Sequence, residues 1–191
     1  MDTLAEAARA LDLRLEVLRV PRSNLPIEAW ADYDAKFPGV VPDWYKRLLQ
    51  DFAFIDVFLD LPHWDDEAWG ANFEFRSPSD EFFDTEDDDE IIPLGWFPFA
   101  EEADGNLWAM KANAPQDSPI IMISHTGGGL QTDGGVHYAA HNLSHLVATA
   151  SISFGRKEHL TPDGFVDESK AGYRMWGQPD THLESLGVED A

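Results

Sequence analysis

The stretch IIPLGWFPFAEEADGNLWAMKANAPQDSPIIMIS, residues 91–124, organises the rest of the chain. Residues 91–99 are rich in large apolar side chains, and Asp104-Gly105 is a dipeptide typical of tight turns. Residues 107–110 can return antiparallel as the second arm of a hairpin, and residues 120–123 supply the next strand. One face of this sheet needs a cover. Because helical patterns flank it in the sequence, we expect a single α+β domain with a central, mostly antiparallel sheet, covered by N-terminal helices and one late helix.

The first two helical patterns lie in the N-terminal 40 residues. Residues 3–18 place apolar side chains at helical spacing, but residues 13–17 alternate with period two and leave a strand open as the alternative. Residues 24–37 are predicted to form a second helix, with Asn24 as its N-cap and Pro38 as part of its stop signal.

A third helix is predicted to start at Pro42. Its polar side carries Lys46 and Gln50. The opposite side is an apolar stripe, which is typical of a surface helix that packs on a core; the stripe consists of Trp44, Tyr45, Leu48, Leu49 and Phe52.

The hydrophobic period then changes to that of strands. Residues 52–59 and 72–76 are predicted to form two strands, separated by a loop at residues 63–70. This loop contains Trp64 and Trp69 among acidic residues. Tryptophan is enriched where proteins bind one another, so the two side chains are candidates for partner contacts, with packing over the core as the alternative.

Charge is the strongest compositional feature, with 13 basic and 36 acidic residues and a net charge of −23. Residues 1–50 hold 8 acidic and 7 basic side chains, whereas residues 51–110 hold 18 acidic side chains and one basic side chain, Arg76. Such a field repels nucleic acid and anionic membranes and accelerates encounter with basic proteins. The alternative is that the charge serves solubility alone.

The densest acidic run, residues 80–90, is predicted to be a solvated or disordered loop. It does not fit a calcium-binding loop, because Asp89 stands where the required glycine would be. Because the acidic charge is concentrated in this part of the chain, we expect the acidic run to contact a basic partner. The candidate partner-binding residues are Trp64, Trp69, Glu86, Asp87, Asp88, Asp89, Glu90, Glu101, Glu102 and Asp104.

His137, His141 and His145 recur every four residues in a segment predicted to be the late helix. At about 100° per residue they would share one face. That face could be a plain solvated surface, a pH-sensitive partner-binding surface, or part of a zinc or nickel site that needs a further ligand from elsewhere. We predict no metal site, and keep a metal-dependent hydrolase using these histidines as the enzyme alternative.

The remaining motifs indicate no catalytic chemistry. The glycine-rich residues 125–135 lack the Gly-Lys-Ser/Thr ending of a phosphate loop, and Ser124-His125 has no nucleophile-elbow context. With no catalytic residue and no cofactor motif identified, we expect a binding protein rather than an enzyme. The chain has no cysteine and no apparent signal or membrane-spanning segment, so we expect a cytoplasmic protein. One domain is expected over residues 1–177, followed by a frayed acidic tail at 178–191.

The central hairpin resembles the SUKH superfamily, whose namesakes include the yeast cell-wall-assembly regulators of the Smi/Knr type. The match covers roughly residues 38–150. The residues that carry it are Ile92-Pro93-Leu94 through Phe99-Ala100, Asp104-Gly105-Asn106 with Leu107-Trp108, Val41-Pro42-Asp43-Trp44-Tyr45 with Leu48-Leu49, and the late helix from His141 to Ala150.

The resemblance implies a function in binding. Bacterial SUKH-like proteins are typically immunity proteins that neutralise a cognate polymorphic toxin, often a nuclease, and an acidic domain is suited to cover a basic active-site surface. We therefore expect stoichiometric occlusion of a basic toxin. The alternative implied by the eukaryotic members is an intracellular regulatory scaffold.

Overall fold

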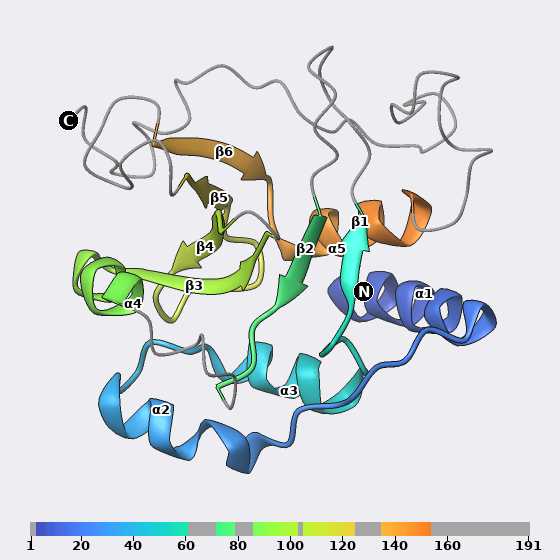
Figure 1. Ribbon diagram of the computed structural model, residues 1–191, viewed down its shortest axis with the longest axis horizontal. Coiled ribbons are helices and arrows are strands. Elements are labelled where there is room, and N and C mark those ends of the chain that lie inside the picture. Colours follow the sequence, from blue (N-terminus) through green and yellow to red (C-terminus); the bar gives the residue numbers. More distant parts are fainter. Residues whose placement is uncertain (1–2, 61–71, 79–85, 103–104, 125–134, 154–191) are drawn as a thin grey trace.

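The structure is a computed structural model that describes residues 3–60, 72–78, 86–102, 105–124 and 135–153 (Figure 1). The described elements, in chain order, are α1 (Thr3–Leu18), the 3-10 helix η1 (Ile27–Trp30), α2 (Ala31–Lys36), α3 (Asp43–Asp51), β1 (Phe58–Asp60), β2 (Asn72–Phe75), α4 (Glu86–Ile91), the 3-10 helix η2 (Ile92–Leu94), β3 (Trp96–Glu101), β4 (Leu107–Lys111), β5 (Ile120–Ile123), β6 (Val136–Ala140) and α5 (Leu143–Ser153).

The six described strands form one antiparallel sheet in chain order, β1 to β6. The sheet curls, so that β1 and β2 run across the direction of β3 and β6 in Figure 1. The predicted central hairpin is present as β3 and β4, with Phe97 opposite Met110. Gly105, with φ at +90°, takes the left-handed conformation that the turn between them requires. The expected α+β class is confirmed.

The main core lies between one face of the sheet and helices α1, α3 and α5. Helix α1 packs along α5; in Figure 1, α5 passes behind β1 and β2, and α1 lies below α5 and extends to the right of β1. Tyr45 of α3 is completely buried and contacts the rings of Trp30 and Phe97 edge to face. Such pairs add to the free energy of burial, so this aromatic centre stabilises the contact of α3 with β3.

A second apolar cluster covers the opposite face of the sheet. It consists of Ile91, Trp96, Leu107, Ala109, Ile121 and Ile123, all buried, with Val136 packed against them. Alternate residues of β4 and β5 therefore enter different clusters, and their apolar side chains are buried on both faces of the sheet except Met122, which is partly buried. This explains why the two strands are almost continuously apolar instead of alternating with polar residues.

Three expectations for the N-terminal half need correction or are settled. Residues 13–17 belong to α1, so the strand alternative is excluded. Asn24 is not an N-cap, because its amide donates to the carbonyl oxygen of Gln50 at 2.9 Å and the following helix has no side-chain cap. Lys46, on the polar side of α3, is buried instead of exposed to solvent. Its ammonium group is paired with the carboxylate of Asp34 at 2.6 Å.

The strand prediction for residues 52–59 was too long, since only Phe58–Asp60 form β1 and Ile55 makes an isolated bridge to Ser23. The predicted strand at 72–76 is confirmed as β2. Residues 91–94 are helical instead of extended: Pro93 enters the 3-10 helix η2, and Gly95, with φ at +84°, ends it.

Several expectations fall outside the described residues. These are the loop at 63–70 with Trp64 and Trp69, the turn residue Asp104, the glycine-rich segment up to residue 134, and everything after residue 153, including the expected tail at 178–191. Among the helices that the structure describes, none is long and apolar enough to cross a membrane.

Candidate partner-binding surface

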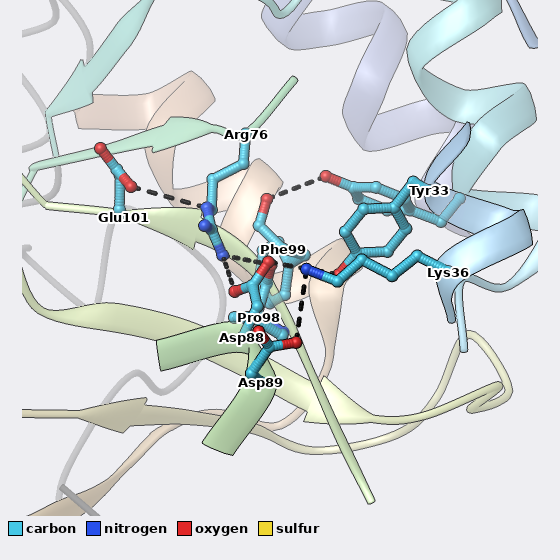
Figure 2. A network of polar contacts seen from close by, with 9 residues as sticks. Tyr33, Lys36, Arg76, Asp88, Asp89, Pro98, Phe99 and Glu101 are labelled. Carbon is cyan, nitrogen blue, oxygen red and sulfur yellow. Dashed lines mark hydrogen bonds and ion pairs between the residues drawn. The ribbon is translucent and has the colours of Figure 1, made fainter. Parts of the chain in front are cut away.

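A buried ion pair fixes helix α4 to the sheet. The guanidinium Nη1 of Arg76 lies 2.7 Å from the carboxylate Oδ1 of Asp88, and their side chains are 3% and 0% exposed. The other carboxylate oxygen accepts a hydrogen bond of 3.5 Å from the hydroxyl of Tyr33 on α2. Figure 2 shows the carboxylate of Asp88 pointing inward from α4 to meet both partners. An unpaired buried charge would strongly destabilise the fold, so the contacts with Arg76 and Tyr33 are what allow the carboxylate of Asp88 to be buried.

A bulge in β3 supplies the neutral part of this network. The pairing of β3 with β4 shifts register between Pro98 and Ala100, at Phe99. The carbonyl oxygen of Phe99 accepts hydrogen bonds from the backbone N–H of Arg76 at 3.1 Å and the hydroxyl of Tyr45 at 3.0 Å. The carbonyl oxygen of Pro98 accepts one from Arg76 Nη1 at 3.3 Å. The bulge thus turns backbone acceptors toward the interior, as bulges often do.

Tyr45 donates its hydrogen bond in this network as a neutral phenol. Burial raises the pKa of Tyr45 well above its ordinary value, because the phenolate would lose its hydration. The hydroxyl therefore keeps its proton around neutral pH, where it donates to the carbonyl oxygen of Phe99.

The outer side of α4 is acidic and faces solvent. Asp89, with a side chain 60% exposed, lies 3.3 Å from the ammonium group of Lys36 on α2, and Glu90 next to it is also exposed. Asp32 is exposed and stands four residues before Lys36, on the same side of α2. We call Asp32, Asp89 and Glu90 the acidic corner. Of the three carboxylates, that of Asp89 is paired with the ammonium group of Lys36, and the three negative charges exceed this single positive charge.

The structure divides the predicted contact residues of the acidic run. Asp89 and Glu90 are exposed, as expected. Asp88 is not available to a partner, which corrects its prediction as a contact residue, and residues 86–90 are helical, which corrects the expected loop. Glu86 and Asp87 lie in α4 by their backbone, and their side chains are outside the description.

The two glutamates at the end of β3 differ from each other in exposure. Glu101 is 35% exposed and its carboxylate lies 3.5 Å from Arg76 Nε, on the opposite side of the guanidinium from Asp88 (Figure 2). Glu102 is buried and accepts a hydrogen bond of 2.8 Å from the amide of Asn106. Glu102 is therefore wrong as a surface contact, since it stabilises the turn instead.

The predicted face of three histidines does not exist. His137 lies in strand β6, and α5 begins only at Leu143. Asn142 is the N-cap of α5: its carbonyl Oδ1 accepts from the backbone N–H of His145 at 3.0 Å. The sequence signal for this boundary was the asparagine just before the apolar run, which the histidine spacing obscured.

Two of the histidines still meet at the start of α5, His141 just before the N-cap and His145 in the first turn. The rings of His141 and His145 lie 5.3 Å apart, edge to face. The pKa of His145 is lowered, first by partial burial and then by the nearby His141. Within the described part of the chain, no three side chains of His, Asp or Glu are grouped so that they could hold a metal ion.

Sequence reasoning missed the cation that organises this region. Arg76 is the single basic residue between positions 51 and 110, and that isolation was the available signal that it pairs with one of the surrounding carboxylates. Which carboxylate it meets depends on the fold. Comparison with known proteins adds no further constraint, because no family model, curated protein or solved structure matches this chain.

Proposed function

We propose that this protein binds a basic protein partner through its acidic surface and performs no catalysis itself. The observation that carries the proposal is the combination of a net charge of −23 with an exposed acidic corner that a buried ion pair holds in place. A fixed array of like charges attracts a basic partner over several ångströms and loses little entropy on binding.

We further propose that the partner is a toxin and that this protein is its immunity protein. Support comes from the resemblance of residues 38–150 to the SUKH superfamily and from the charge. Nucleases bind phosphates with basic surfaces, and an acidic domain can cover such a surface at one-to-one stoichiometry. We favour this function over the hydrolase alternative, because His137 lies in β6, His141 precedes α5 and His145 lies in α5, so that the three histidines do not form one helical face.

The test of function is capture of the partner from the cells that produce the protein. The full-length chain is immobilised, bound proteins are eluted with rising salt and identified, and the activity of each is titrated with free chain. We expect one basic partner whose activity falls to zero at a one-to-one ratio. A partner that keeps its activity when saturated would contradict immunity and favour a regulatory scaffold.

A matched pair of variants tests the surface. Asp89→Asn/Glu90→Gln removes two charges from the acidic corner, and Asp51→Asn/Asp117→Asn removes two exposed charges elsewhere. We expect the first variant to slow association with the captured partner about tenfold at low salt and the second about twofold or less, because charges near the contact dominate steering. Equal effects would show that only net charge matters and would reject the corner as the contact.

A further inference from the structure

Helix α1 presents an apolar stripe to solvent. Its inner face buries Leu4, Ala8, Leu11 and Leu15. On its outer face, Leu13 and Val17 are 61% and 66% exposed, the two highest values among the exposed large apolar side chains of the described residues. Ala10, one turn before Leu13, is exposed as well. Three apolar side chains at this spacing form a continuous strip, and such strips commonly mark contacts with another protein.

Charged residues of both signs flank this strip. At about 100° per residue, Ala10, Leu13 and Val17 lie within about 60° of one another. Arg9 and Glu16 are exposed and lie about 40–60° around the helix from Leu13, on the side away from Ala10 and Val17. Arg9 is near the N-terminal end of the strip and Glu16 near its C-terminal end. Exposed Glu6 lies in line with the strip, one turn before Ala10, and limits its apolar length to Ala10, Leu13 and Val17.

We propose that α1 pairs antiparallel with α1 of a second copy of this chain, forming a homodimer. A two-fold axis between residues 12 and 13 brings Leu13 beside Leu13 of the second copy. The same axis places Arg9 level with Glu16 of the other copy, on the same side of the contact, and Val17 next to the other Ala10. The two-fold axis repeats the contact of Val17 with Ala10 and that of Arg9 with Glu16, so each occurs twice, as in an isologous interface.

The charge distribution of the whole chain favours this face over others. Two chains of net charge −23 repel each other, but residues 1–50 are nearly balanced, with 8 acidic and 7 basic side chains. In Figure 1, α1 and α4 lie toward opposite ends of the molecule. A dimer through α1 therefore keeps the acidic corners far apart and leaves both of them open to solvent.

The proposed contact is small, and its salt dependence is distinctive. One pair of short helices buries less area than a standard protein interface, so we expect a dissociation constant on the order of micromolar or weaker. Salt screens the repulsion between the two acidic molecules over distances beyond about 10 Å. Dimerisation should therefore strengthen about threefold or more between about 20 and 200 mM salt, whereas binding of a basic partner weakens.

Sedimentation equilibrium of the full chain tests the contact. We expect Leu13→Glu/Val17→Glu to raise the dissociation constant at least about 100-fold while the circular dichroism spectrum stays unchanged, because both side chains are exposed. The matched control, Gln50→Glu/Gln116→Glu, adds the same two charges at exposed positions elsewhere and should dimerise within about twofold of the wild type. A wild-type chain that remains monomeric up to about 1 mM would overturn the proposal.

Charge reversal tests the antiparallel geometry itself. Arg9→Glu and Glu16→Arg should each weaken the dimer about tenfold, since each creates two repulsive contacts. The double variant restores opposite charges and should return the constant to within about threefold of the wild type. Additive weakening in the double variant would exclude this register.

A crosslink reports the position of the two-fold axis. The chain has no cysteine, so Leu13→Cys introduces the single thiol of the molecule. A short bismaleimide should then link two copies efficiently, and Asp117→Cys should give little linkage under the same conditions. Equal linkage of both variants would mean random collision and would count against the dimer.

Discussion

Helix α4 buries an acidic side chain, and helix α1 exposes apolar side chains; both arrangements are the reverse of what residue type alone predicts. In α4, five acidic residues follow one another, and the third, Asp88, is fully buried while its neighbour Asp89 is exposed. In α1, Leu11 and Leu15 are fully buried while Leu13 and Val17 are mostly exposed. Residue type therefore does not decide burial in either helix; the groups that the neighbouring elements offer decide it.

The neighbours differ in kind. For α4 they are a guanidinium and a tyrosine hydroxyl, which both donate to one carboxylate. The carbonyl oxygen of Pro98 in the bulged strand accepts from the same guanidinium. For α1 they are the apolar side chains of the main core, which accept one face of the helix and leave the other uncovered. The acidic helix is held by a polar contact of fixed geometry, and the apolar helix by packing.

The largest effect should come from Asp88. Asp88→Ala leaves the buried guanidinium of Arg76 with only the more distant and partly exposed carboxylate of Glu101, so we expect the free energy of unfolding to fall by about 3 kcal/mol. The control Asp89→Ala removes a mostly exposed charge and should change it by about 0.5 kcal/mol or less. Urea denaturation measures both. Similar losses at the two positions would mean that Asp88 is not the anchor of α4.

The next effect separates the two faces of α1. Leu11→Ala creates a cavity in the main core, and we expect a loss of about 2–5 kcal/mol in the free energy of unfolding. Leu13→Ala should cost about 0.5 kcal/mol or less when measured below the concentration at which the chain dimerises. A large loss for Leu13 at such dilution would show that its side chain stabilises the monomer.

A smaller effect is expected from the hydroxyl of Tyr45. Tyr45→Phe removes its hydrogen bond to the Phe99 carbonyl, which keeps the second bond from the backbone of Arg76. We expect a loss of about 1 kcal/mol, since the acceptor remains partly satisfied. The loss should not vary between pH 6 and about pH 9, because the raised pKa of Tyr45 keeps the hydroxyl protonated. A loss that changes with pH would contradict that role.

The smallest effect concerns His145. Its pKa is lowered in the folded protein, so the neutral ring is favoured by folding. The stability that this contributes is present above the unfolded value of about 6.5 and is lost as the pH falls through the folded value. Proton NMR should show His145 titrating below about 6.5, and His141→Asn should raise its pKa by removing the nearby positive charge. An unchanged pKa in that variant would leave burial as the whole cause.

Much of the fold followed from local patterns. The hairpin of β3 and β4 was predictable from two apolar runs around Asp104-Gly105, and α1 and α3 from apolar residues at helical spacing. The errors arose where period or composition was ambiguous. Residues 91–94 are as apolar as a strand but form a helical turn at Pro93, and the histidine spacing of four extends across a strand, a cap and a helix.

The candidate surface was less predictable than the fold. Composition identified residues 86–90 as acidic and associated them with a basic partner. It did not distinguish the carboxylate that is buried from those that are exposed. Asp32 and Lys36, more than 50 positions earlier, could not be assigned to the same corner from the sequence. Contacts between α2 and α4 place them there, and such long-range contacts leave no periodic signal in one sequence.

The sequence by itself determined the class of the fold, the position of the central hairpin and the sign and unevenness of the charge, because these depend on composition and on the repeat of neighbouring residues. Tertiary structure alone decided that Asp88 is an internal anchor, that Asp89 and Glu90 remain at the surface, and that α1 keeps an uncovered apolar strip. The physical reason is that burial of a charge or exposure of a leucine depends on which groups the folded chain brings beside it, and those groups come from distant positions.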